Sequence, residues 1–240
     1  MTDKIKRAVK RLPFAMNSDR AYSLKRRVLH LLFPNRCPIC SCIIGCDDRF
    51  CGECRSKLNS FEGSFNIPET DSFTAAFVYD KEVSPAVILM KNGVCGNAPY
   101  ALGGELAERL ISDGIPDNID IIVPVPMYRA DVWSRSYNQA ELIAKEVGRM
   151  LGKPCVTGAV VKIRKTADQK RLDHIKRRYN LKGAFAVTDT GAVSGRRILL
   201  IDDVCTTGST LAEIAALLKA NGTASVHCAA CCKTPLAAKK

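Results

Sequence analysis

Residues 198–210, with the sequence ILLIDDVCTTGST, combine an apolar run, two acids, a glycine and several hydroxyl side chains in one short segment. Glycine lets a backbone approach a ligand closely, and hydroxyl groups donate hydrogen bonds to phosphate oxygens. A helix that begins after such a turn presents free N–H groups and a positive dipole end to an anion. The segment therefore predicts a phosphate-binding loop, formed by Thr206, Thr207, Gly208, Ser209 and Thr210.

Two acids, Asp202 and Asp203, directly precede this loop. Carboxylates repel phosphate unless they bind another part of the ligand, and sugar hydroxyls or a magnesium shell would account for them. The pair therefore predicts a sugar with a 5′-phosphate and two neighbouring hydroxyls. The simpler alternative is a strand, turn and helix with an acidic cap, but a cap requires neither two acids nor several hydroxyls. The loop lacks the lysine of a Walker A motif and the glycine spacing of a dinucleotide fold.

Four cysteines with the spacing C-x2-C-x10-C-x2-C form a second candidate site: Cys37, Cys40, Cys51 and Cys54. Each pair can direct two thiolates at one ion, and four thiolates complete a tetrahedral Zn²⁺ site that is structural because no position stays open. An iron–sulfur cluster and unligated core cysteines are the alternatives. Cys42 and Cys46 lie between the pairs and could replace a ligand or belong to a second site. The other six are expected to be small buried side chains: Cys95, Cys155, Cys205, Cys228, Cys231 and Cys232.

The chain has 240 residues and a net charge of +12, which points to an anionic partner such as nucleic acid, a phosphorylated small molecule or a membrane surface. Residues 1–36 carry +8 and residues 162–178 carry +6, so the remainder is slightly acidic. No apolar run reaches the roughly 18–20 residues needed to cross a bilayer, and no apolar signal segment follows the basic N-terminus. We therefore expect a cytoplasmic protein, in which cysteines are thiols or metal ligands.

The elements that must position these sites follow a βα pattern from residue 73 onward, which predicts an α/β fold with a mostly parallel sheet. Strands are expected at residues 119–125, 197–201 and 225–230, and helices at 137–151 and 209–220. Leu102, Leu106 and Leu110 mark an earlier helix. Residues 59–70, of mixed polarity, predict a domain boundary between the cysteines and the sheet.

The segment 198–210 resembles the signature with which type I phosphoribosyltransferases bind phosphoribosyl pyrophosphate (PRPP). The wider sequence is similar to the ComF family, in which a zinc ribbon precedes such a domain. The matching segments are CPIC, CGEC, LMKNG at 89–93, VPVP at 123–126, RSYNQAELIA at 135–144, and RKTADQKRL with YNLKGAF within 164–185. The resemblance runs from about residue 24 to 235 and implies a zinc ribbon with a preceding helix at 24–62 and a phosphoribosyltransferase-like domain at 70–235. Residues 1–23 are a basic N-terminal extension that falls outside it.

The activity that this resemblance implies is binding of PRPP with Mg²⁺ and transfer of its phosphoribosyl group to an unidentified nitrogen nucleophile. In the family, the segment corresponding to 164–178 closes over the substrate, so Arg135, Arg164 and Lys165 are candidates for pyrophosphate contacts. A solvated charged face is the simpler explanation of that run. Purine-salvage relatives carry an acid at the position of Thr206, and its absence argues against hypoxanthine or guanine as acceptor.

The alternative function is that of a non-catalytic accessory protein in DNA uptake and natural transformation, handling single-stranded DNA. The resemblance to ComF and the basic arm motivate it, because such an arm would bind phosphate backbones in a salt-dependent way. The amphipathic residues 24–33 could pack on the ribbon, which is the simpler interpretation, or rest on an anionic membrane. His30 within them is expected to be an ordinary helix residue and not a zinc ligand.

Overall fold

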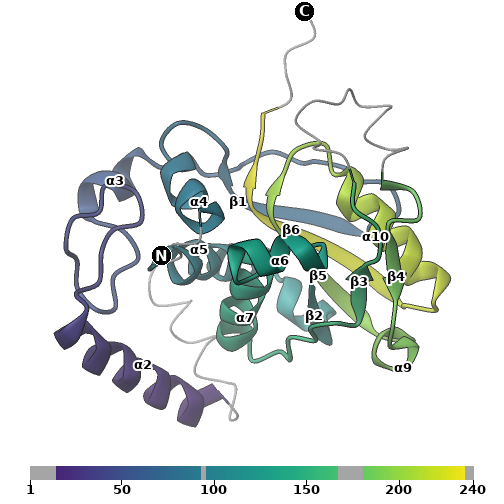
Figure 1. Ribbon diagram of the computed structural model, residues 1–240, viewed down its shortest axis with the longest axis horizontal. Coiled ribbons are helices and arrows are strands. Elements are labelled where there is room, and N and C mark those ends of the chain that lie inside the picture. Colours follow the sequence, from purple (N-terminus) through teal and green to yellow (C-terminus); the bar gives the residue numbers. More distant parts are fainter. Residues whose placement is uncertain (1–14, 93–95, 167–180, 236–240) are drawn as a thin grey trace, which may run out of the picture.

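A computed structural model describes residues 15–92, 96–166 and 181–235 of the chain, and its centre is a four-stranded parallel sheet (Figure 1). The strand order is β1-β6-β5-β2, and each neighbouring pair runs parallel. The strands are β1 (Ser72–Val78), β2 (Ile121–Pro124), β5 (Arg197–Cys205) and β6 (Ser225–Lys233). The predicted α/β fold with a mostly parallel sheet is confirmed.

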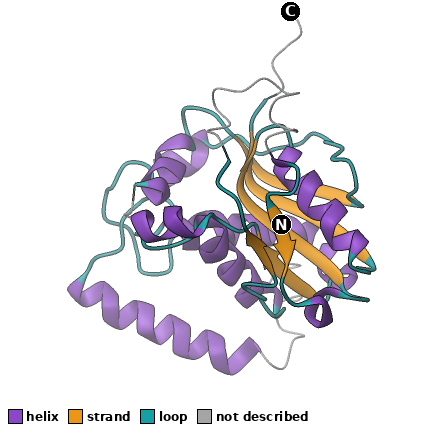
Figure 2. Ribbon diagram, turned by 45° about the vertical axis from the view of Figure 1, so that its right-hand side comes forward, coloured by secondary structure: helices purple, strands orange, loops and turns teal. Residues whose placement is uncertain are grey.

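Helices cover both faces of the sheet (Figure 2). One layer contains α4 (Ser84–Lys91), α5 (Ala98–Ser112) and α7 (Gln139–Leu151). The other contains α9 (Thr190–Val193), α10 (Ser209–Ala220) and the antiparallel pair β3 (Val160–Lys162) and β4 (Phe185–Val187). Two short elements, η1 (Ile115–Asn118) and α6 (Arg129–Arg135), lie on either side of β2 in the chain. Strand residues alternate between these layers, so that Leu199 and Ile201 face the first and Ile198 and Leu200 face the second.

The predicted helices and strands are present. Some of their first and last residues differ from the predicted ones, because strand pairing or helix capping determines where these elements begin and end. The helix at 209–220 has the predicted bounds, whereas the one predicted from residue 137 begins at Gln139 because Asn138 caps it. Strand β5 continues to Cys205 and β6 to Lys233, because these two strands pair with each other as far as those residues. Asp202 and Asp203 therefore lie within the end of a strand.

The ribbon residues pack against α5 through the buried guanidinium of Arg49. Its Nη1 atom lies 3.1 Å from Oε1 of Glu105 and 2.9 Å from Oε1 of Glu108. Burial opposes the charge, but the two acids outweigh it and raise the pKa of Arg49. A Cβ atom on Gly104 would overlap this guanidinium, so glycine provides the space that the ion pairs need.

We expect Arg49→Met to destabilise the fold by roughly 1.5–3 kcal/mol, because Glu105 keeps its charge in a mostly buried position and loses one of its two guanidinium partners, the other being Arg55. Urea unfolding measures this change. The control is Lys57→Met, which removes an exposed ion pair with Glu53 and should cost less than about 1 kcal/mol. Equal costs for the two variants would contradict this account of the interface.

Helix α2 (Ala15–Leu32) contacts the body through polar side chains. The guanidinium of Arg26 lies 3.5 Å above the ring of Tyr100 and donates hydrogen bonds to the backbone oxygen of Cys46 and to Asn97. Tyr22 donates a hydrogen bond to Glu146. The apolar side chains that were expected to mediate packing are largely exposed: Leu24, Val28, Leu31, Leu32 and Phe33. His30 accepts a hydrogen bond from the backbone N–H of Asn35 through Nδ1, as suits an ordinary helix residue.

Residues 59–71 connect the ribbon to the sheet and lie along β1. The N–H of Val78 donates to the oxygen of Asn59, and the N–H of Phe61 donates to the oxygen of Ala76. Ile67 is almost completely buried. The segment predicted as a boundary is therefore packed in the fold, and the division into 1–23, 24–62 and 70–235 stays a prediction.

The cysteines of the sheet are packing residues, as predicted: Cys205, Cys228, Cys231 and Cys232 are buried. Burial raises the pKa of Cys205 to about 12, so its thiol is protonated at neutral pH. Cys155 is partly buried, and Cys95 lies outside the described residues. Among the described helices, none combines the length and apolar character that a bilayer span requires.

Candidate functional site

All seven residues predicted to bind the ligand line one pocket of about 290 Å³ at the carboxyl end of β5. Strand β5 supplies Asp202 and Asp203, the following turn supplies Thr206, Thr207 and Gly208, and the start of α10 supplies Ser209 and Thr210. The carboxyl ends of the strands in an open α/β sheet are where ligands bind. The sequence segment therefore folds into a single site.

The turn of the loop depends on Gly208, whose φ is +76°. A Cβ atom there would lie 2.9 Å from Cγ1 of Ile67, so the linker residues pack directly beneath the loop. The hydroxyls of Thr207 and Ser209 lie 2.9 Å apart, and α10 begins at once after the glycine. The loop thus combines hydroxyl donors with a helix N-terminus, as an anion site requires.

We expect Gly208→Ala to destabilise the protein by roughly 1–3 kcal/mol, because alanine meets both an unfavourable φ and the side chain of Ile67. Thermal unfolding would detect this as a lowered midpoint. Gly191→Ala is the matched control, because that glycine lies in α9 with no close backbone or carbon neighbour and no positive φ. An equal midpoint for both variants would show that Gly208 is not conformationally required.

The two acids differ in their surroundings. Nζ of Lys91, at the end of α4, lies 3.2 Å from Oδ2 of Asp203. Burial opposes the charge on Lys91, but Asp203 and Asp202 outweigh it and raise the pKa of Lys91. Burial and the Asp203 carboxylate raise the pKa of Asp202 to about 8. A cation or a pair of hydroxyl donors would relieve this repulsion between the carboxyl groups.

A second pocket of about 290 Å³ lies on the other side of the acid pair. The turn after β2 forms one wall, with Met127 and Tyr128, and Lys162 of β3 forms another. Lys91, Asp202, Asp203 and Thr210 line both pockets, so the two are lobes of one site. The site therefore offers a hydroxyl-lined loop at one end, the acids with Lys91 in the middle and Lys162 at the other end.

The start of α7 fixes the position of Lys91. The hydroxyl of Tyr137 donates to the backbone oxygen of Met90 at 2.7 Å, and the amide of Gln139 donates to the same oxygen at 3.1 Å. The amide of Asn138 donates to the oxygen of Val125. The segment RSYNQ thus joins the end of α4 to the end of β2.

Lys233 supports the phosphate loop from below. Its side chain is only 2% exposed, and Nζ donates to the backbone oxygens of Thr206 and Thr234 at 2.8 and 2.6 Å. Nζ also lies 4.1 Å from the ring of Phe65. Burial lowers the pKa of Lys233. Sequence reasoning missed Lys91, Lys162 and Lys233 as parts of the site, and only the LMKNG motif gave a signal for the first.

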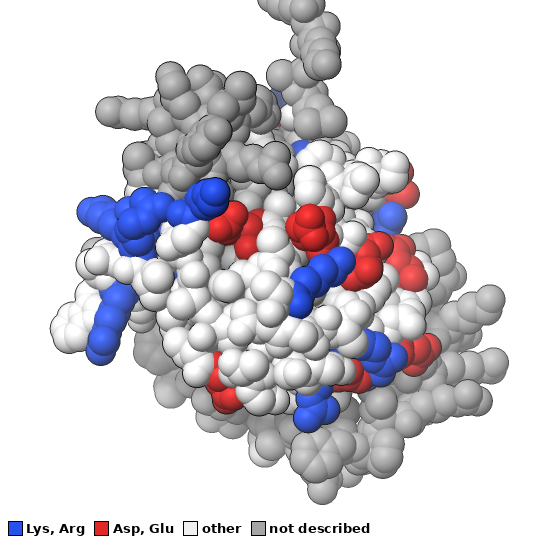
Figure 3. Space-filling view, turned by 90° about the vertical axis from the view of Figure 1, so that its right-hand side faces the viewer, with Lys and Arg blue, Asp and Glu red and all other residues white. Residues whose placement is uncertain are grey.

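Of the three predicted pyrophosphate contacts, Arg164 and Lys165 line neither lobe. Arg164 and Lys165 are exposed beyond β3, and Arg164 donates a hydrogen bond to the backbone oxygen of Lys182. The side chain of Arg135 lies outside the described part of the structure, as do residues 167–180. Lys and Arg side chains gather at one edge of the face that carries β4 and α10 (Figure 3).

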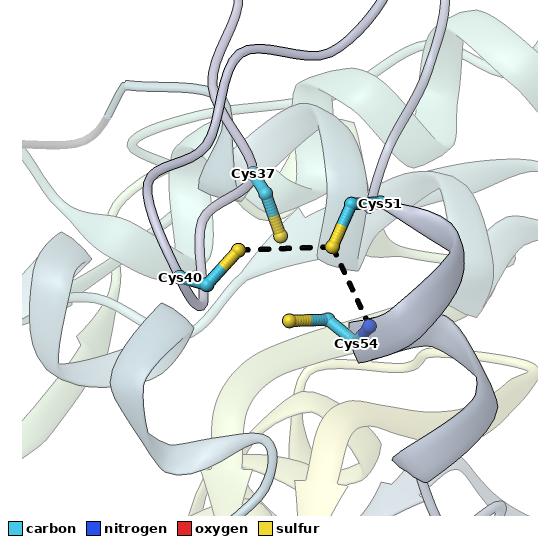
Figure 4. Close-up of side chains that lie close together, drawn as sticks. All are labelled: Cys37, Cys40, Cys51 and Cys54. Atoms are coloured by element: carbon cyan, nitrogen blue, oxygen red, sulfur yellow. Dashed lines mark hydrogen bonds between the residues drawn. The ribbon is translucent and has the colours of Figure 1, made fainter.

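The four cysteines of the predicted zinc site converge, with Cys51 and Cys54 contributed by the start of α3 (Gly52–Lys57) and its cap (Figure 4). Their sulfur atoms all lie within 4.8 Å of one another, and Sγ of Cys40 and Cys51 are 3.7 Å apart. A tetrahedral zinc ion with Zn–S bonds of about 2.3 Å needs sulfurs about 3.8 Å apart, whereas a multi-iron cluster spreads its ligands further. The geometry therefore supports structural zinc.

Cys42 lies next to this site but outside the group of four. Its Sγ lies 3.4 Å from Sγ of Cys40, within hydrogen-bond distance of the thiol. Hydrogen bonds from the backbone and thiol of Cys42 lower the pKa of Cys40 to about 6. Cys42 therefore favours the thiolate of a neighbouring ligand. Cys46 also lies outside the group and offers its backbone oxygen to Arg26.

Together, the parallel sheet, the acid pair with its phosphate loop and the cysteine site define a phosphoribosyltransferase-type domain that carries a zinc ribbon. The family model described as phosphoribosyl transferase domain matches residues 97–240, and that described as double zinc ribbon domain matches residues 28–65. These matches agree with the positions of the two sites.

Two curated relatives and one solved structure illustrate the similarity. Competence protein F of Haemophilus influenzae is 40% identical over 189 residues, covering 74% of this chain and 82% of its own length. DNA utilization protein YhgH of Escherichia coli K12 is 32% identical over 209 residues, covering 82% of this chain and 90% of its own. The structure of APRTase from Giardia lamblia with 9-deazaadenine covers 74% of this chain and 82% of that one, at 17% identity and a TM-score of 0.39. The chain belongs to the competence protein F (ComF) family of phosphoribosyltransferase-domain proteins.

Proposed function

We propose that this protein binds PRPP with Mg²⁺ in the two-lobed site and transfers the phosphoribosyl group to a nitrogen nucleophile. The observation that carries the proposal is the order of groups along the site, from the hydroxyl-lined loop through the acid pair with Lys91 to Lys162. PRPP has the same order of groups, with a 5′-phosphate, two ribose hydroxyls and a pyrophosphate. A small anion with a single phosphate would fill only the first lobe and leave the second lobe empty.

Each part of PRPP has its own binding residues in this proposal. The loop from Thr206 to Thr210 holds the 5′-phosphate, and Asp202 and Asp203 accept hydrogen bonds from the ribose hydroxyls. Lys91 and Lys162 face the pyrophosphate from the second lobe, with the turn after Val125 on its other side. Arg135, Arg164 and Lys165 remain candidates for further pyrophosphate contacts. Mg²⁺, when bound, would neutralise part of the pyrophosphate charge.

The reaction breaks the bond between the anomeric carbon and the pyrophosphate oxygen, and the electron pair leaves with pyrophosphate. The lone pair of the nucleophile forms the new carbon–nitrogen bond, and the nitrogen then releases a proton to solvent. The lysines stabilise the charge that grows on the leaving group, and the loop and acid pair hold the ribose in place.

Isothermal titration of the purified protein with PRPP and MgCl₂ tests the proposal. We expect saturable one-to-one binding, with weaker binding of ribose 5-phosphate and of pyrophosphate, because each of these occupies only one lobe. Failure of the wild-type protein to bind PRPP with MgCl₂ would overturn the proposal. Release of pyrophosphate on addition of candidate amines then tests turnover.

A second function, handling of single-stranded DNA during uptake, is favoured by the relatives named competence protein F and DNA utilization protein. The basic residues 1–36 would supply the phosphate contacts, and both functions place the protein in the cytoplasm.

Because Arg26 holds α2 against the body, its charge is a poor target for mutation. Deleting residues 1–14, which leaves α2 and Tyr22 in place, and changing Lys25 and Arg27 to glutamine should weaken DNA binding and reduce its salt dependence. Unchanged affinity and salt slope would remove the support for this function.

A further inference from the structure

A third cavity, of about 610 Å³, lies beside the second lobe, between α6, the start of α7 and β3. Its walls are mainly apolar, with Pro124, Val132, Val160 and Val161 among the lining residues. Trp133 of α6 also lines it. The volume is within the range of about 300–1,000 Å³ that is typical of small-molecule sites. We call this space the tryptophan cavity.

Trp133 is the only tryptophan of the chain and is 80% exposed. A single exposed apolar side chain needs no explanation by itself. Here the indole borders an apolar cavity, so a planar ligand could cover the ring and the cavity wall together. Aromatic rings in such positions act as stacking platforms for other rings.

The charged groups of the cavity favour an anionic occupant. Arg129 and Lys162 line it, and Glu141 is the acid among the lining residues. Lys145 lies 2.6 Å from the carboxylate of Glu141 and compensates its charge. Two positive side chains therefore face a cavity that has no uncompensated acid among its described lining residues. An aromatic wall beside positive charges suits a base that is attached to phosphate.

The tryptophan cavity continues into the second lobe. Pro126, Met127, Asn138 and Lys162 line both spaces, and the second lobe reaches Asp202 and Asp203. A ligand that stacks on Trp133 thus lies next to the place that the proposed function assigns to pyrophosphate. This position makes the cavity an entry route toward the reacting centre.

We propose that the tryptophan cavity binds a nucleobase, stacked on Trp133, with its phosphate against Arg129. The relation of this site to PRPP rests on the proposed function, whereas the cavity itself does not. The base can belong to a single DNA strand or to a free nucleotide, and both present the same planar ring and phosphate.

Titration of the tryptophan fluorescence, excited where tyrosine does not absorb, tests the proposal directly, because Trp133 is the only tryptophan of the chain. The probes are adenosine 5′-monophosphate and an oligodeoxyadenylate. Quenching by the oligonucleotide alone identifies a strand as the source of the base, and quenching by both shows that the base with one phosphate suffices. No quenching by either probe overturns the proposal.

A mutation series separates stacking from mere proximity. Affinity for a labelled oligodeoxyadenylate, followed by anisotropy, should fall roughly ten- to a hundredfold in Trp133→Leu and only a few-fold in Trp133→Phe, which keeps an aromatic ring. Ile43→Ala removes an exposed apolar side chain from the ribbon, outside the cavity, and should leave the affinity unchanged. Wild-type affinity in Trp133→Leu would overturn the proposal.

Titrating the wild-type protein with PRPP and MgCl₂ in parallel distinguishes this proposal from the proposed function. Fluorescence quenching by the adenylate probes without PRPP binding would leave the tryptophan cavity as a base site and remove the transferase. PRPP binding without quenching would keep the transferase site and remove the base site.

Discussion

Replacing Asp202 and Asp203 together with asparagine is expected to weaken binding of PRPP with Mg²⁺ at least a hundredfold. The change removes the charge-assisted hydrogen bond that Asp203 would accept and the one that Asp202 would accept once it has lost its proton, and each such bond contributes roughly 1.5–3 kcal/mol. It also leaves Lys91 without the carboxylate that lies 3.2 Å from its Nζ. Isothermal titration in the same buffer as for the wild-type protein measures the loss.

This loss should not come from unfolding. Because the pKa of Asp202 is raised to about 8 in the folded protein, the folded state binds this proton more tightly than the unfolded chain does. The free energy of unfolding therefore falls as pH rises from about 4 toward 8, and a neutral asparagine at 202 avoids that loss. Asp189→Asn, at the cap of α9, is the matched control and should retain PRPP affinity. Wild-type affinity in the double variant would remove the acid pair from the proposed site.

Removal of zinc should unfold the ribbon and lower the stability of the whole protein. Zinc binding to small four-ligand sites contributes an apparent 10–16 kcal/mol at neutral pH in isolated peptides. In this chain Cys37, Ile44 and Phe50 pack into the same core as α4 and α5, so the effect should extend beyond the ribbon. We expect one zinc per chain by elemental analysis, and a lower thermal midpoint with faster hydrogen exchange at residues 35–58 after chelation.

Variants of single cysteines give the corresponding control. Cys37→Ser should lose the zinc, whereas Cys155→Ser, a partly buried cysteine outside the site, should keep it. Retention of a full equivalent of zinc by Cys37→Ser would show that Cys37 is not a ligand. Iron and sulfide in place of zinc in the purified protein would favour the alternative cluster.

Both principal sites could be predicted from the sequence because their residues are local. The acid pair and loop occupy residues 198–210, and the cysteine pairs are separated by ten residues. Spacing within such segments determines the relative positions of their side chains almost directly, because a short strand, turn and helix in succession can adopt few conformations. The βα alternation predicted the parallel sheet for the same reason.

The tertiary structure decided which distant residues join these segments. Lys91 follows β1, Lys162 lies in β3 and Lys233 ends β6, and they meet the acid pair or its loop only because of the strand order and the parallel directions. Apolar periodicity fixes which face of a strand is buried but not which strand is its neighbour.

The tertiary structure also determined which side chains of the amphipathic segments are exposed to solvent. Amphipathicity predicted an inward apolar face for residues 24–33, but Arg26 forms the contact with the body and leaves Leu31 in solvent. The tryptophan cavity likewise joins elements from α6 to β3. The sequence by itself thus determined the fold class, the acid pair with its loop and the cluster of four cysteines, because local spacing encodes them. Packing between distant elements determined the lysines and the base site, because long-range contacts depend on topology.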